Sequence, residues 1–220
     1  MKQFDPTVIT HNVQPILSGL AYTVGTWTAG VLIGMAIGFM IAVLQLFGSR
    51  WLRALLRAYV EFFRGTPFLI QLFLLYYGGP SFGLTLEPMT AGVIGLGLYS
   101  SAYFAEAFRS GFRSVPKGHI EAAQCLGLSR LQTVWRVQLP QMLVLIVPAL
   151  TNLTIVLSKE TAVLSIVTVP ELTFVLTGIG SATFAFMETL LVLCVCYLAL
   201  VETTSRAGAW AEKRLARIYA

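Results

Sequence analysis

The 220-residue chain is too apolar for an ordinary water-soluble domain, since 56% of its residues are hydrophobic and only 11% are charged. Several windows of about 20 residues carry no charge, which is the length that a helix needs to cross the core of a bilayer. The net charge of +5 resides mainly in connections between apolar stretches, so a nucleic-acid partner is not expected.

Five apolar stretches predict five membrane-spanning helices, at about 18–47, 66–79, 90–108, 141–158 and 184–203. The connections after the first, third and fifth stretches hold four, five and four of the 15 lysines and arginines. Because basic connections remain in the cytoplasm, the N-terminus is expected outside and the C-terminus inside. The predicted fold is an all-α polytopic membrane protein that forms a single transmembrane domain over residues 1–220.

Two features near the start of the chain predict how its helices pack. Gly30, Gly34 and Gly38 recur every four residues, so they lie on one helix face and let another helix approach closely. The segment 49–64 combines arginines with aromatic residues and leucines, which is typical of an amphipathic helix at the membrane interface.

The longest basic connection, residues 109–139, is expected to contain two short helices. Ser114 and Pro116 are typical of a helix start, and Gly127 is typical of a left-handed helix end. A second helix is expected after Ser129, which can cap it. Such short helices cannot bury an apolar side alone, so a protein partner at the membrane surface is expected.

Several motifs resemble the permease subunits of ATP-binding cassette importers. Glu121-Ala122-Ala123, followed by Gly127, resembles the EAA loop that is the signature of these subunits. Further ordered matches resemble the polar amino acid and opine branch of the family: Phe63-Arg-Gly-Thr-Pro67, Ser101-Ala-Tyr-Phe-Ala-Glu106, Ser114-Val-Pro-Lys-Gly118, Leu126-Gly-Leu-Ser129, Leu139-Pro-Gln141 and Pro170-Glu-Leu-Thr173. The chain departs from the family pattern at Ser110, at His119 and at Thr161-Ala-Val-Leu164.

The resemblance implies short coupling helices that dock on a separate ATPase subunit. The residues that it assigns to coupling are Ser114, Pro116, Gly118, Glu121, Ala122, Ala123 and Gly127. ATP and Mg would be bound by that partner, because this chain contains no Gly-x-x-x-x-Gly-Lys-Ser/Thr sequence. The other implied partners are a second permease subunit, identical or paralogous, and an extracytoplasmic substrate-binding protein. The implied location is the bacterial inner membrane.

Polar groups at membrane depth are the candidates for solute binding, because such groups are costly in lipid unless they face protein or water. By this criterion the candidates are Gln71, Ser100, Ser101, Glu106, Lys159, Glu160 and Thr161. Glu106 and Glu160 are suited to an ammonium group, and Lys159 with the hydroxyls to a carboxylate. Alternatively, Lys159 and Glu160 sit at the membrane interface and pair with each other or with water.

The apolar segment 163–186 contains helix breakers, so a short outer helix or re-entrant piece is expected there. An ion-gradient-driven amino acid transporter remains the alternative, but it leaves the Glu-Ala-Ala loop unexplained. An intramembrane enzyme is disfavoured because the sequence contains neither His-Glu-x-x-His nor Gly-x-Ser-x-Gly. The three cysteines form no metal-binding or disulfide pattern, so no metal is expected.

Overall fold

The computed structural model describes residues 5–219, and every regular element in that part of the chain is helical. The expected all-α fold is therefore confirmed there. In chain order the elements are α1 (Thr7–His11), α2 (Val13–Phe47), α3 (Arg50–Gly65), α4 (Phe68–Phe73), η1 (Leu74–Gly78), η2 (Gly79–Phe82), α5 (Pro88–Ser114), α6 (Lys117–Cys125), α7 (Arg130–Thr133), η3 (Val134–Gln138), α8 (Leu139–Glu160), η4 (Thr161–Val167), α9 (Leu172–Thr183) and α10 (Phe186–Tyr219).

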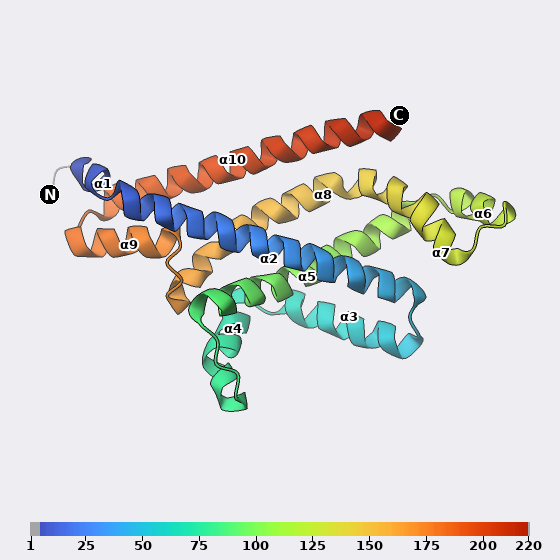
Figure 1. Ribbon diagram of the computed structural model, residues 1–220, viewed down its shortest axis with the longest axis horizontal. Coiled ribbons are helices and arrows are strands. Elements are labelled where there is room, and N and C mark those ends of the chain that lie inside the picture. Colours follow the sequence, from blue (N-terminus) through green and yellow to red (C-terminus); the bar gives the residue numbers. More distant parts are fainter. Residues whose placement is uncertain (1–4, 220) are drawn as a thin grey trace.

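Four long helices, α2, α5, α8 and α10, run along the long axis of the molecule (Figure 1). α5 lies in the middle, where it contacts α2, α3, α4 and α8. α10 packs on α8 and α9. The short helices α1 and α9 lie at one end, and α6 and α7 lie at the opposite end (Figure 1). The chain thus has two distinct ends joined by a helical bundle.

Within residues 5–219, three helical stretches are long and apolar enough to cross a membrane: Val13–Phe47, Arg130–Val167 and Phe186–Leu215. The first two contain the predicted segments 18–47 and 141–158, and the third covers all of the predicted segment 184–203 except its first two residues. α5 has 27 residues and contains the predicted segment 90–108, but it is richer in Gly, Ser and Tyr. The predicted segment 66–79 falls in the shorter apolar stretch Phe68–Phe82, which extends away from the long axis (Figure 1).

The expected close approach along the glycine face of α2 is confirmed. A Cβ added at Gly30 would meet the side chain of Leu96 at 2.7 Å, and one added at Gly38 would meet Phe104 at the same distance. The hydroxyl of Ser100 donates to the carbonyl of Gly30 over 3.1 Å, which joins the two helices inside this contact. The glycines on this face of α2 therefore set the distance between α2 and α5, because they have no side chain to keep the helices apart.

α3 is the amphipathic helix that the sequence predicts, and Ser49 caps it by accepting from the backbone N–H of Leu52. It turns back from the end of α2 and packs on both α2 and α5 (Figure 1). Its buried face includes Val60 and Tyr59, and the Tyr59 hydroxyl lies 2.7 Å from the Ser101 hydroxyl of α5. α3 is thus packed against the bundle as one of its helices.

The segment between α8 and α10 forms the short helix that was expected there, α9. Glu171 caps α9 by accepting from the backbone N–H groups of Phe174 at 2.7 Å and Thr173 at 2.9 Å. Glu171 is fully buried, and it also accepts from the hydroxyl of Tyr197 on α10 at 3.4 Å. This cap therefore joins α9 to the last long helix.

Candidate functional site

The first candidate site is α6, which protrudes at one end of the bundle (Figure 1). Gly118, Glu121 and Ala122 are exposed on it. A hydrogen bond of 2.7 Å joins Nδ1 of His119 to Oε1 of Gln141 and so connects α6 directly to α8. α6 is therefore joined to a long helix by a defined polar contact.

The turn after α6 has the left-handed geometry that the sequence predicts. Gly127 has φ of 80°, a value that a residue with a Cβ adopts only at a cost. Its N–H donates to the carbonyl of Gln124 at 2.9 Å, which closes the end of α6. Ser129 then accepts from the N–H of Gln132, whose side chain accepts from the Ser129 N–H at 2.8 Å. This reciprocal capping box fixes the start of α7.

Two residues that were expected at the start of α6 have other roles in the structure. Ser114 does not cap α6, because its hydroxyl donates to the carbonyl of Gly111 at 2.8 Å and completes the last turn of α5. Pro116 is the residue before the first turn of α6, not within it. Ala123 is only 4% exposed, so its side chain contacts this chain; Ala122 is the exposed alanine of the motif.

The second candidate site is a polar stripe on the open face of α5. Tyr99, Tyr103 and Glu106 follow at helical spacing, and the Tyr99 hydroxyl donates to the Tyr103 hydroxyl at 3.1 Å. Glu106 forms an ion pair with Arg109, with Nε of Arg109 2.9 Å from Oε2 of Glu106. The guanidinium of Arg64 on α3 lies 5.6 Å from the centre of the Tyr103 ring. Opposite charges and hydroxyls thus share one face of the central helix.

In the part of the chain that the structure describes, two cavities reach this stripe at Glu106. A cavity of about 770 Å³ lies between α2, α3 and α5, and one of about 610 Å³ lies between α5 and α8. Arg64 and Glu106 line both, so the cavities adjoin at these two side chains. The second cavity also contains Tyr103 and Asn152. Volumes of this size are typical of small-molecule sites.

The structure brings only one of the seven solute-binding candidates, Glu106, to these cavities. Ser100 and Ser101 are fully buried within helix contacts, where each hydroxyl donates to a backbone carbonyl. The amide N–H group of Gln71 donates to the Thr66 hydroxyl at 2.7 Å and so fastens the turn between α3 and α4. These three side chains hold helices in place.

The remaining candidates lie together at the end of α8. Lys159 is exposed and Glu160 is half-buried, and neither belongs to an ion pair identified in the described part of the chain. Thr161 is buried, with its hydroxyl 2.7 Å from the carbonyl of Ser158 and 3.2 Å from the hydroxyl of Tyr197. Arg64 was not among the solute-binding candidates predicted from the sequence. Its spacing from Arg57 and Arg53 nevertheless indicates that all three lie on one face of α3.

Comparison with known proteins settles the family to which this bundle belongs. Residues 30–217 match the family model described as "Binding-protein-dependent transport system inner membrane component". The chain belongs to this family. The matched residues include the whole polar stripe of α5 and all of α6, so both candidate sites lie inside the family domain.

Relatives of this transport component match over most of their length. The chain is 37% identical to the L-cystine transport system permease protein TcyB of Bacillus subtilis (strain 168), over 75% of this chain and 71% of the relative. It is 31% identical to the arginine transport system permease protein ArtQ of the same organism, over 91% of this chain and 92% of the relative. A solved structure described as an amino acid ABC transporter with histidines superposes with a TM-score of 0.91 at 33% identity, covering 97% of this chain and 100% of the other.

Proposed function

We propose that the chain is the permease subunit of an ATP-binding cassette importer for polar amino acids or related compounds such as opines. The observation that carries this proposal is the exposed helix α6, with Glu121 and Ala122 on its outer side, within a chain of the transport-component family. An ion-gradient-driven transporter would leave this Glu-Ala-Ala helix unexplained.

In this proposal the chain crosses the bacterial inner membrane five times, with its N-terminus outside and its C-terminus in the cytoplasm. α5 is one of the spans, because its 27 residues cover about 40 Å at the helical rise of ~1.5 Å per residue. The stretch Phe68–Phe82 would contribute to the remaining crossing together with the end of α3, because alone it is shorter than the ~20 residues that a spanning helix needs. The basic residues at the α6 end support a cytoplasmic position of that end.

The cytoplasmic end would dock a separate ATPase, which binds ATP and Mg, so this chain itself catalyses no reaction. Glu121 would meet a basic or amide group of that partner, and Ala122 would allow close approach. The hydrogen bond from His119 to Gln141 supports a transmission route from α6 into α8. Nucleotide-driven closure of two ATPases would then rock the bundle.

The polar stripe of α5 would line the solute path, completed by a second permease subunit, identical or paralogous. Glu106 would receive the ammonium group of an amino acid, and Arg64 or Arg109 its carboxylate. Lys159, Glu160 and the end of α8 would contact the solute nearer the outside, where a substrate-binding protein docks. Gln71, Ser100, Ser101 and Thr161 would keep the surrounding helices in register.

The test is uptake of labelled amino acids by proteoliposomes that contain the complete complex. Uptake is expected with internal ATP and not with an imposed ion gradient alone. Glu106→Gln should lower uptake while complex assembly is kept, and Glu202→Gln on the exposed face of α10 is the matched control. Gradient-driven uptake without the ATPase would refute the proposal.

A further inference from the structure

The larger cavity carries a charge imbalance that a path for neutral amino acids does not require. It is lined by five arginines, Arg53, Arg57 and Arg64 from α3 and Arg109 and Arg113 from α5, but by only two acidic residues. Its lining comes from the last residues of α2, from α3 and from the last part of α5, so it lies near the connections that follow α2 and α5. This arginine cleft, lined by those five residues, therefore has a surplus of three positive charges.

Neighbouring acids do not neutralise the cleft. In the part of the chain that the structure describes, the ion pair within the cleft joins Arg109 to Glu106. Glu61 is then the remaining acid for Arg53, Arg57, Arg64 and Arg113. Like charges held close together repel one another, so such an arrangement is stabilised by an anion that enters from outside.

The arrangement of the arginines identifies the kind of anion. Arg53, Arg57 and Arg64 stand at spacings of four and seven on α3, so they share one helix face that looks across at the stripe of α5. Planar guanidinium groups match the oxygens of a phosphate with paired hydrogen bonds, and several arginines can share one phosphate. The volume of about 770 Å³ exceeds what a phosphate alone would fill.

The rest of the lining indicates where the phosphate comes from. Ala42, Leu46 and Val60 add an apolar side to the cleft, next to the arginines. The cytoplasmic leaflet offers anionic lipids with this combination of a phosphate and an apolar body, and basic pockets between membrane helices attract them. We propose that the arginine cleft is a binding site for the phosphate group of an anionic phospholipid, which joins α3 to the cytoplasmic half of α5.

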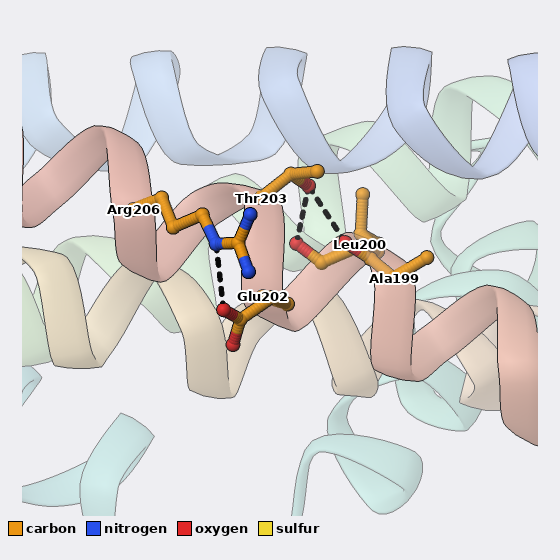
Figure 2. Close-up of polar contacts among 5 residues, drawn as sticks. All are labelled: Ala199, Leu200, Glu202, Thr203 and Arg206. Atoms are coloured by element: carbon orange, nitrogen blue, oxygen red, sulfur yellow. Dashed lines mark hydrogen bonds and ion pairs between the residues drawn. The ribbon is translucent and has the colours of Figure 1, made fainter.

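The proposed lipid site rests on the orientation given under "Proposed function" and adjoins the proposed solute path at Arg64 and Arg109, so its test uses Arg53 and Arg57, which line the larger cavity and not the smaller one. It is tested with the full-length chain in micelles, by native mass spectrometry and thermal unfolding with added phosphatidylglycerol, phosphatidylcholine or inorganic phosphate. The cleft variant is Arg53→Gln with Arg57→Gln, both exposed positions. The control variant, Arg50→Gln with Arg206→Gln, loses the same charge outside the cleft; Figure 2 shows Arg206 on α10 paired with Glu202.

Phosphatidylglycerol should raise the unfolding temperature more than phosphatidylcholine, because it binds the folded chain selectively. The cleft variant should bind phosphatidylglycerol at least about tenfold more weakly than the control, since it loses two charge-assisted contacts. Equal binding by the two variants, or equal binding of the two lipids, would overturn the proposal. Stabilisation by inorganic phosphate alone, lost in the cleft variant, would overturn the assignment to a lipid. Uptake assays report separately on the transport function.

Discussion

Gly38→Ala tests whether the contact between α2 and α5 sets the stability of the bundle. A Cβ at this position would lie 2.7 Å from Cβ of Phe104 and 2.8 Å from both the N of Ala105 and the O of Ser101. Ordinary contacts of this kind begin at 3.4 Å, and the obstructing atoms include backbone, which cannot rotate away. Overpacking of a well-packed interior costs about 1–3 kcal/mol, so Gly38→Ala should lower the free energy of unfolding by that amount.

Gly25→Ala is the matched control, because Gly25 lies on the same helix and a Cβ there meets nothing within 4 Å. It should leave the free energy of unfolding unchanged or raise it by up to ~1 kcal/mol, since alanine is the better helix former. The assay is unfolding of the purified chain in mixed detergent micelles, followed by the loss of helical circular dichroism. Equal stability of Gly38→Ala and Gly25→Ala would show that the α2–α5 contact is not close enough to matter.

Substitutions at Glu121, Gly127 and His119, each with a matched control, test the proposed role of α6 and the turn after it in coupling. Glu121→Lys should abolish pull-down of the ATPase while membrane insertion is retained. Glu202→Lys, on the exposed side of α10, should leave pull-down intact. Equal capture of the ATPase by both variants would contradict the docking role of Glu121. Gly127→Ala should cost about 1–2 kcal/mol of stability because the residue is left-handed, and it should reduce ATP-driven uptake. Gly25→Ala on α2, where an added Cβ meets nothing within 4 Å, should not reduce uptake. His119→Ala, which loses the hydrogen bond to Gln141 of α8, should uncouple ATP hydrolysis from uptake, and His119→Gln should preserve coupling. Identical uptake by the two variants would show that this hydrogen bond is not part of the transmission route.

The sequence was sufficient for the features that depend on local patterns. Long charge-free stretches predicted the long helices, and four-residue glycine spacing predicted the α2–α5 contact. Gly127 and Ser129 predicted the corner between α6 and α7, because left-handed glycine and a capping serine act within a few residues of themselves. α2 and α10 both continue beyond the apolar stretches 18–47 and 184–203: α2 already begins at Val13, and α10, which begins at Phe186, continues to Tyr219.

The sequence was less informative wherever a side chain has a choice of partners. Ser114 could cap α6 or complete α5, and the structure shows that it bonds back to α5. Ser100 and Gln71 are polar residues in apolar surroundings, which suggests function, but each finds a partner in a neighbouring turn or helix. The contact between Arg64 and Tyr103 could not be predicted, because it joins two helices that are distant in sequence.

The most direct test of the account uses the natural thiol on the coupling helix. Cys125 is exposed at the end of α6, and replacing Cys194 and Cys196 with serine leaves it as the single thiol of the chain. A membrane-impermeant maleimide is then applied to sealed vesicles of either orientation, with and without the ATPase. The account predicts labelling of Cys125 only in inside-out vesicles, and protection once the ATPase is bound. Labelling from the outside, or labelling that the bound ATPase does not change, would contradict it.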